Sequence, residues 1–313
     1  MIAALGEALV DLIQQPDGNF KACLGGSVFN FCIGAARQGL ATAYLNPLSQ
    51  DRFGRQFDAS LHENGVDLKA GFTSRLPTAL AIVSLDVEGK ASYAFHHGPV
   101  ANREIDAQKI IASLPQPLAL LHTGGLALIP EDIDTVITVM QHAAKRGAVL
   151  SVDANLRPIA ASDLGAYRLG VMRAVRQAHI VKVSDEDLLH LGYGSDDAVA
   201  SARKLFESSE VRLIALTLGA AGGALLTRSD MAQMPTPKNL AVKDTVGAGD
   251  CFHAGLIAYL AHDDKLSQDA IKKLDNDFLR NALRHAIAAA SINIMRPGCD
   301  PGTWEETVAF DVA

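Results

Sequence analysis

A short glycine-rich segment in the last third of the sequence holds the residues best suited to chemistry. Gly247-Ala248-Gly249 directly precedes Asp250 and an apolar, helical pattern over 251–260. Small residues leave backbone amides uncovered, and amides at the start of a helix attract anions with the help of the helix dipole. A carboxylate there can accept the proton of an attacking hydroxyl. The segment therefore suits phosphoryl transfer to a hydroxyl group, and a plain turn with Asp250 as a helix cap fits the local pattern equally well.

Other motifs of nucleotide and metal sites are missing from the sequence. Neither a G-x-x-x-x-G-K-[ST] loop nor a G-x-G-x-x-G fingerprint occurs, which excludes the usual P-loop and disfavours a dinucleotide-dependent oxidoreductase. The cysteines have no C-x-x-C spacing, so we expect small buried thiols rather than metal ligands or a redox pair at Cys23, Cys32, Cys251 and Cys299.

The elements that must position this segment follow an alternating pattern. Apolar, strand-like runs cover 118–122, 148–152, 179–183 and 211–217. Helical patterns lie between them: one begins at 130–132 and ends at Gly147, one covers 164–178, and Ser184-x-x-Asp187 predicts the cap of a third. Strands that alternate with helices pair in parallel, with helices on both faces of the sheet. Ligands of such sheets bind beyond the carboxyl ends of the strands, here the loops after Val152, Val183 and Thr217.

One region departs from this alternation. The segments 78–85 and 90–95 are rich in strand formers, and 86–89 reads as the hairpin turn between them. With short strands near the N-terminus they would form a small separate sheet. A sheet beside an α/β body suggests a lid over an active site.

The overall charge narrows the possible partners and location. The 313 residues include 28 basic and 35 acidic side chains, for a net charge of −7, and Lys and Arg do not cluster. Nucleic-acid binding is therefore not expected. The N-terminal segment carries Glu7 and Asp11 and lacks a basic start, and no uncharged apolar run reaches about 18 residues, so we expect neither a signal peptide nor a membrane span. These features predict a cytoplasmic protein.

The sequence resembles the ribokinase-like (PfkB) carbohydrate kinases, most of all bacterial fructokinases. The family's C-terminal signature, D-T-x-G-A-G-D, is matched by Asp244-Thr-Val-Gly-Ala-Gly-Asp250, and its N-terminal signature by Gly25-Gly-Ser-Val-Phe-Asn30. Asp51-Arg-Phe-Gly54 matches the family's D-x-x-G. The resemblance covers the whole chain. It implies an α/β fold with a three-layer parallel sheet, helices on both faces and a small β-sheet lid. It also implies one kinase domain over 1–313, with the lid formed by segments at about 8–24 and about 72–100.

The resemblance also implies roles for individual positions. Asp250 would be the catalytic base, and the backbone amides of Gly247, Ala248 and Gly249 would hold the transferring phosphate. The sugar would be bound by Asp11, Gly25, Gly26, Asn30, Tyr93 and Arg157. ATP would be bound by Asn155, Lys182, Asp187, Thr217, Gly219 and Gly222. A monovalent cation would be held by carbonyls of Asp244, Val246, Asn293, Arg296 and Gly298. Ser184-Asp-Glu-Asp187 stands where the family often has Asn-x-x-Glu, which bears on how the water shell of Mg²⁺ is held.

The implied activity is ATP-dependent transfer of the γ-phosphate to a primary hydroxyl of a small sugar, with Mg²⁺ and K⁺ as further cofactors. We favour fructose as the acceptor. His97 stands where fructokinases usually have an Arg, with Arg103 downstream, so 2-keto-3-deoxygluconate, ribose and a riboside stay open. A non-catalytic sugar or nucleotide sensor is the alternative from another class, and the intact Asp250 and Gly-Ala-Gly segment argue against it. The resemblance further implies a homodimer formed through the lid.

Overall fold

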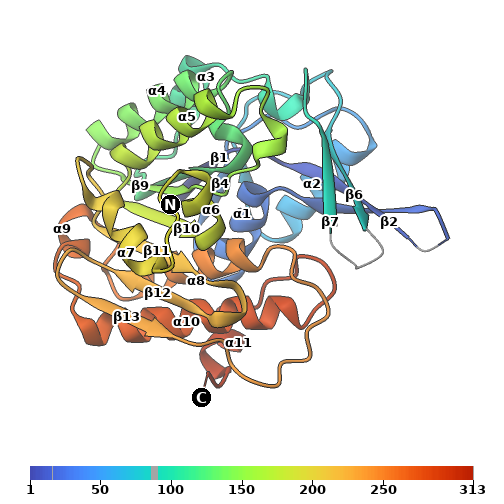
Figure 1. The fold of residues 1–313 in the computed structure, drawn as a ribbon. Helices are drawn as coiled ribbons and strands as arrows, with labels where there is room; N and C mark the ends of the chain where they lie inside the picture. The colour runs from blue at the N-terminus through green and yellow to red at the C-terminus, as the bar shows by residue number, and fades with distance from the viewer. Residues whose placement is uncertain (16, 86–90, 313) are drawn as a thin grey trace.

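A large, mostly parallel sheet forms the centre of the molecule (Figure 1), which is described here from a computed structural model covering residues 1–15, 17–85 and 91–312. From one edge to the other its strands are β13 (Met231–Met234), β12 (Gly223–Leu226), β11 (Leu213–Thr217), β10 (Ile180–Ser184), β9 (Val149–Asp153), β8 (Leu120–Gly124), β1 (Ile2–Leu5), β4 (Thr42–Tyr44) and β5 (Asp67–Leu68). The pairs β11–β12 and β12–β13 are antiparallel. The other pairs are parallel.

Helices cover both faces of this sheet because its strands are apolar on both sides. In β1, Ala3 and Leu5 belong to one buried core while Ile2 and Ala4 belong to the other, as the two-residue period of a strand requires. The first core also contains residues of α3 (Ala107–Ser113), α4 (Ile133–Lys145), α5 (Leu164–Gln177), α6 (Asp185–His190) and α7 (Ala198–Arg203). The second contains residues of α1 (Ser27–Arg37), α2 (Arg52–Glu63), α8 (Ala248–His262), α9 (Gln268–Ile271) and α10 (Asn276–Ile294), beside which α11 (Trp304–Ala309) packs.

The predicted elements of the body are confirmed, with ends that shift by a few residues. The four predicted strands are β8, β9, β10 and β11, and the two predicted helices are α4 and α5. Ser184 caps α6 as expected: its hydroxyl accepts from the amide of Asp187, and its own amide donates to the Asp187 carboxylate at 2.8 Å. The structure also has short 3₁₀ helices: η1 (Ala101–Arg103), η2 (Gly125–Leu128), η3 (Pro158–Ala160), η4 (Lys204–Phe206) and η5 (Gly219–Ala221).

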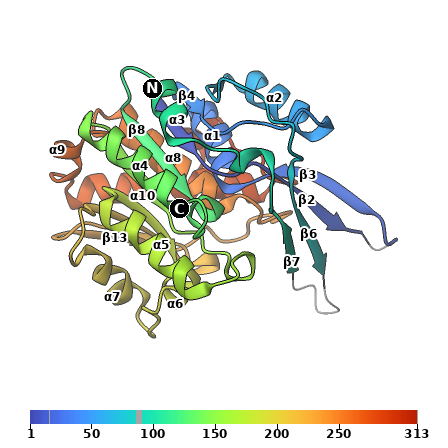
Figure 2. The same cartoon turned by 90° about the horizontal axis from the view of Figure 1, so that it is seen from above.

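The predicted small sheet is also present. Its strands lie in the order β3 (Phe20–Gly25), β2 (Leu9–Gln14), β6 (Ala79–Leu85) and β7 (Ala91–His96). The central pair β2–β6 is parallel and the outer pairs are antiparallel. Figure 2 shows this sheet projecting from the side of the body. The predicted hairpin turn at 86–89, and Lys90 of the predicted second strand, lie outside the described residues.

The order of the strands determines where a ligand can bind. The chain builds the sheet outward from β1 through β4 to β5 on one side, and from β8 through β9 to β11 on the other. The reversal therefore falls between β1 and β8, and a crevice at the carboxyl ends of the strands is expected there. In the described part of the chain, no helix is both long and apolar enough to cross a bilayer.

Candidate active site

Two adjoining cavities lie at the carboxyl ends of the strands of the large sheet. The first has a volume of about 350 Å³ and the second about 830 Å³. Both are large enough for a small organic ligand. They share a lining of Ser184, Glu186, Thr245, Ala248 and Gly249. The two cavities therefore meet at the first turn of α8.

The first cavity brings together most of the residues predicted to bind a sugar. Asp11 comes from β2, Asn30 from α1, Tyr93 from β7 and Arg157 from the loop after β9. The cavity is also lined by Gly26, Gly247, Ala248, Gly249 and Asp250. Gly25 lies against Asp11: a Cβ atom on Gly25 would come within 2.5 Å of Oδ2 of the Asp11 carboxylate. These positions lie far apart in the sequence, and the fold joins them in one cavity.

The residues predicted to bind ATP divide between the two cavities. Thr217, Gly219 and Gly222, at the end of β11 and in the turn that follows, line the second cavity. The apolar side of this cavity is formed by Leu240, Val242, Ile287 and Ile294, among others. Asn155, Lys182 and Asp187 instead line the first cavity.

Asp250 lines the first cavity, in the first turn of α8 and next to Gly249, which lines both cavities. Its side-chain Oδ2 accepts a hydrogen bond from Asn30 Nδ2 at 2.8 Å, across 220 residues of sequence. Burial raises the pKa of this carboxyl from 3.8 to about 6, against the hydrogen bond from Asn30 and the charges of Lys182 and Arg157, which lower it. The N-cap of α8 is Gly247, and in the described part of the chain no side chain, that of Asp250 included, makes a capping hydrogen bond. The capping interpretation of Asp250 is therefore wrong.

The backbone before Asp250 leaves amides free. Gly247 has φ of 74°, and a Cβ atom there would come within 2.3 Å of Cys299 Sγ, so only glycine fits. The Ala248 amide donates to the Thr245 carbonyl at 3.3 Å. Within the described ranges, the amides of Gly247 and Gly249 have no hydrogen-bond acceptor. A helix start with free amides beside a carboxylate can hold an anion next to a proton acceptor.

A buried ion pair lies beside this helix start. Lys182 Nζ is 3.1 Å from Asp153 Oδ1, and the side chains are 6% and 3% exposed. Burial raises the pKa of Asp153 to about 7, against the nearby Lys182 charge. Burial also opposes the charge of Lys182, but Asp153, Asp187 and Asp250 outweigh it, and the pKa of Lys182 is raised. We conclude that the ammonium is charged.

The first cavity is rich in carboxylates and contains few cations. Burial raises the pKa of Glu7, and it raises the pKa of Asp11 to about 6. The Arg157 guanidinium lowers the pKa of both, as it does for Asp250. Among the described residues that line the cavity, Arg157 and Lys182 are the basic ones. The cavity therefore suits a neutral polyol better than an anionic sugar.

Glu7 and Asp153, like Glu186, are acidic residues at the site that were not assigned from the sequence. Glu7 follows β1 and is 5% exposed; its Oε1 accepts from the Ser27 hydroxyl at 2.9 Å, and its buried Oε2 has no hydrogen-bond partner among the described residues. Asp153 ends the buried strand β9. The available signal was the same for both: an acid at the carboxyl end of an apolar strand in a parallel sheet.

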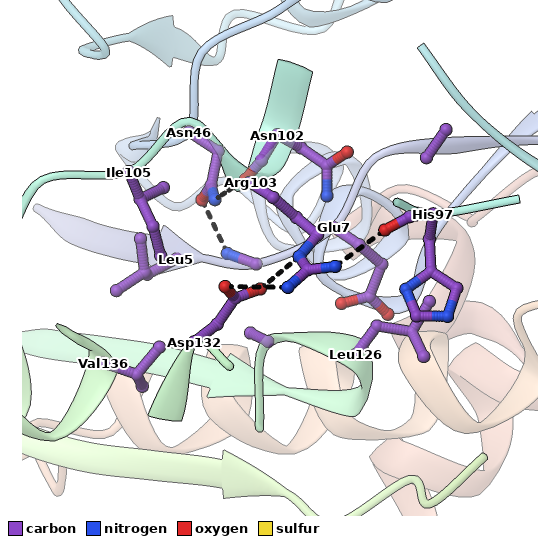
Figure 3. Close-up of a pocket in the computed structure, with 13 residues that line it drawn as sticks. Leu5, Glu7, Asn46, His97, Asn102, Arg103, Ile105, Leu126, Asp132 and Val136 are labelled. Atoms are coloured by element: carbon purple, nitrogen blue, oxygen red, sulfur yellow. Dashed lines mark hydrogen bonds and ion pairs between the residues drawn. The ribbon is translucent and has the colours of Figure 1, made fainter. Parts of the chain in front are cut away.

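A much smaller pocket of about 10 Å³ lies behind Glu7 (Figure 3) and is too small for a sugar. Arg103 on its wall donates to Asp132 through Nε at 2.6 Å and through Nη2 at 3.2 Å, and to the His97 carbonyl through Nη1 at 2.8 Å. His97 Nε2 donates to the Ala160 carbonyl at 2.9 Å. Arg103 therefore ties the end of β7 to the start of α4 and does not present its charge to the first cavity.

The residues predicted to hold a monovalent cation come from two segments, 244–246 and 293–298, which hydrogen bonds join. Asp244 accepts from the amides of Val246 and Gly298 at 3.0 and 2.9 Å. Asn293 Nδ2 donates to the Val246 carbonyl at 2.7 Å, and Arg296 pairs with Glu306 at 2.6 Å. These residues lie together beside α8, where Cys251 Sγ and Cys299 Sγ are 4.0 Å apart, a closeness that their sequence spacing did not indicate.

Asp187 occupies a more constrained position than its predicted role suggested. Its Oδ2 accepts from the Ser184 amide and its Oδ1 from the Leu156 amide, both at 2.8 Å. The carboxylate therefore joins the start of α6 to the loop after β9. The neighbouring Glu186 lines both cavities, and its side chain is 80% exposed.

The α/β body has two cavities that meet at the first turn of α8, beside a buried carboxylate, and this arrangement suits phosphoryl transfer between two bound ligands. A model described as "pfkB family carbohydrate kinase" matches residues 1–306. The chain belongs to this family.

Individual relatives agree with this assignment. The chain is 31% identical over 285 residues to a fructokinase of Rhizobium leguminosarum bv. trifolii, covering 90% of this chain and 86% of the relative. Its fold is similar to that of a fructokinase with bound ATP from Xylella fastidiosa, with a TM-score of 0.84, 24% identity and coverage of 98% and 97%. It is also similar to a fructokinase double mutant from Vibrio cholerae in a form with fructose, ADP and potassium ion, with a TM-score of 0.77, 23% identity and coverage of 96% and 94%. The predicted resemblance to PfkB kinases and fructokinases is confirmed.

Proposed function

We propose that the chain transfers the γ-phosphate of ATP to a primary hydroxyl of fructose. The observation that carries this proposal is the place of Asp250, which lines the first cavity directly after Gly249, a residue that lines both cavities and has a free amide. A sugar in the first cavity would direct a hydroxyl toward Asp250, and a nucleotide in the second would direct its phosphates toward the same turn of α8. The similarity to fructokinases supports fructose as the acceptor.

In this mechanism the residues of the chain position the reactants and move one proton. The Asp250 carboxylate accepts the proton of the acceptor hydroxyl as its oxygen bonds to the γ-phosphorus and the bond to ADP breaks. Asn30 holds the carboxylate in place through its hydrogen bond. The free amides of Gly247 and Gly249 stabilise the charge on the transferring group, whereas the Ala248 amide donates to the Thr245 carbonyl. Asp11, Asn30, Tyr93 and Arg157 would bind the other hydroxyls of the sugar.

The charges of the first cavity favour fructose over an acidic acceptor. Glu7, Asp11 and Asp250 line the first cavity together with Arg157, and a substrate carboxylate would meet these acids. Arg103 cannot compensate, because Asp132 and the His97 carbonyl engage it. We therefore place 2-keto-3-deoxygluconate below fructose. Ribose and a riboside are neutral, so the charges do not separate them from fructose.

The second cavity provides the nucleotide site of this proposal. The adenine would lie against the apolar side chains of Leu240, Val242, Ile287 and Ile294, and the phosphates near Thr217 and Gly219. Mg²⁺ prefers carboxylate, phosphate and water oxygens, so Glu186, which lines both cavities and is exposed, suits it at their junction. Mg²⁺ would neutralise charge on the phosphates. K⁺ is proposed at the loop of Asp244, Val246, Asn293, Arg296 and Gly298.

The small sheet would act as the lid of the site. Leu9, Ile13, Val83 and Phe95 from its strands form one wall of the first cavity. Tyr93 is 39% exposed and Phe20 is 49% exposed, so the sheet presents apolar surface to solvent. A homodimer through this sheet would cover that surface. The cytoplasmic location stays a prediction.

A direct test measures ADP release with fructose, ribose, a riboside and 2-keto-3-deoxygluconate as acceptors. We expect the highest kcat/KM with fructose and the lowest with the acid. In parallel, fructose together with an unreactive ATP analogue should raise the melting temperature, since a bound ligand stabilises the folded state. A faster reaction with another acceptor would refute the fructose assignment. Stabilisation by sugar without any turnover would instead favour the non-catalytic sensor.

A further inference from the structure

The small pocket behind Glu7 is lined by several buried polar atoms that have no hydrogen-bond partner. Some of its polar side chains bond to one another or to the backbone. In contrast, Glu7 Oε2, His97 Nδ1 and Asn102 Oδ1 are buried and have no partner among the described residues, although all three residues line this pocket. A buried polar atom without a partner costs free energy, so three of them at one small pocket require an explanation.

The chemistry of two of these atoms excludes a direct hydrogen bond between them. His97 Nε2 donates to the Ala160 carbonyl at 2.9 Å, so Nδ1 of the neutral ring is an acceptor. The ionised Glu7 carboxylate also only accepts, and its other oxygen, Oε1, takes the Ser27 hydroxyl at 2.9 Å. Two acceptors are joined by a molecule that donates two hydrogen bonds.

The size of the pocket matches a single water molecule. Its volume is about 10 Å³, and a water needs a space of about 10–15 Å³ and two to four polar partners. Figure 3 shows the Glu7 carboxylate and the His97 ring on the same side of the pocket. A water donates twice, and it can accept a third bond from the Asn102 amide. A cation is disfavoured, because the Arg103 guanidinium lies on the wall of the same pocket.

The two acceptors belong to segments that build the first cavity. Glu7 holds Ser27 at the start of α1, the helix that also carries Asn30. His97 directly follows β7, the strand that carries Tyr93 of the first cavity. A bridge between Glu7 and His97 therefore joins the small sheet to the helix that carries Asn30.

We propose that one buried water donates to Glu7 Oε2 and to His97 Nδ1, and that His97 is thereby a positioning residue for the sugar. The bridge holds the end of β7 against the start of α1, so Tyr93 keeps its place at the first cavity. The effect on the sugar rests on the proposed kinase reaction, whereas the water itself does not. The competing interpretation is that His97 acts through its bond to Ala160 alone.

A high-resolution crystal structure of the protein tests the water directly. We expect a density peak within about 3.2 Å of both Glu7 Oε2 and His97 Nδ1. The absence of a peak between these two ordered side chains would overturn the proposal. This measurement needs no reaction: a bound water without any turnover of fructose would refute the acceptor and leave the bridge standing.

Two substitutions of His97 separate the water bridge from the bond to Ala160. The amide of a glutamine reaches the place of Nε2 and can keep the bond to Ala160, whereas the shorter asparagine places its amide near Nδ1 and can keep the water. We expect His97→Gln to raise KM for fructose about tenfold, with kcat and KM for ATP within about threefold of the wild type. His97→Asn should keep all three within about threefold. An unchanged KM for fructose in His97→Gln, or a rise as large in His97→Asn, would overturn the proposal.

His142→Gln provides a matched control. His142 lies in the last turn of α4, is half-buried, and lines neither the two cavities nor the small pocket. Its substitution should leave KM for fructose within about threefold, and thermal unfolding confirms that each variant is folded. A tenfold rise in this control would show that the loss of any half-buried histidine is sufficient, and would also overturn the role of His97.

Discussion

Replacing Asp250 with asparagine should make the enzyme more stable while nearly abolishing its activity. The carboxylate is buried, and its pKa is raised from 3.8 to about 6. Since one pKa unit corresponds to about 1.4 kcal/mol, the folded state pays about 3 kcal/mol to keep Asp250 ionised at neutral pH. An asparagine avoids this cost and can still accept the hydrogen bond from Asn30. For a chain of this length we expect a melting temperature higher by about 2–6 °C.

The stability gain should depend on pH in a defined direction. Above pH about 6 the carboxyl is ionised in both the folded and the unfolded chain, so the wild type carries the full cost. As the pH falls the folded carboxyl takes up a proton first, and near pH 4 both states are protonated. The gain in unfolding free energy from Asp250→Asn should therefore be complete above pH about 6 and be lost as the pH falls from about 6 to about 4.

The same substitution should lower kcat by about 10²–10⁴-fold, because the general base is removed. Binding of ATP and sugar should change little. In the wild type, kcat/KM should fall as the pH drops below about 6, when Asp250 of the free enzyme becomes protonated. The assays are ADP release and thermal unfolding across pH 4–8. Asp269→Asn is the control, since its side chain is 89% exposed, and its stability should stay within about 0.5 kcal/mol of the wild type.

Either of two results would refute this reasoning. A folded Asp250→Asn enzyme within threefold of wild-type kcat would remove Asp250 from the mechanism. A variant less stable than the wild type at pH 7.5 would show that the ionised carboxylate is stabilised by its surroundings, contrary to its raised pKa.

Three further predictions concern the catalytic turn, the cation and the assembly. Gly247→Ala should lower the free energy of unfolding by about 1–3 kcal/mol and lower kcat, because the new Cβ atom would lie at a left-handed position within 2.3 Å of Cys299 Sγ. An unchanged midpoint of urea unfolding would contradict this. ATP turnover should require Mg²⁺ and rise several-fold in K⁺, since the loop of Asp244 and Gly298 adjoins α8; equal rates in K⁺ and in tetramethylammonium at matched ionic strength would exclude a cation requirement. Light scattering at micromolar concentration should give the mass of a dimer, and a monomer mass would argue against pairing through the small sheet.

The sequence by itself determined some of the elements of this protein and its class. Local patterns were sufficient for β8 to β11, α4 and α5, because the period of apolar residues reports which face is buried. The cap of α6 was readable because Ser184 and Asp187 are three residues apart. The catalytic segment and its family signatures lie within short stretches, so the chemistry around Asp250 could be inferred before the fold was known.

Only the tertiary structure decided how distant residues act on one another. Asn30 meets Asp250 across 220 residues, and Lys182 meets Asp153 because β10 lies beside β9. Neither contact has a local signature, since strand order depends on how the whole sheet packs. Burial decided the rest. It leaves one oxygen of Glu7 without a hydrogen-bond partner among the described residues, and it raises the pKa of Asp250. Desolvation depends on every segment that closes over a side chain, so a local pattern does not report it.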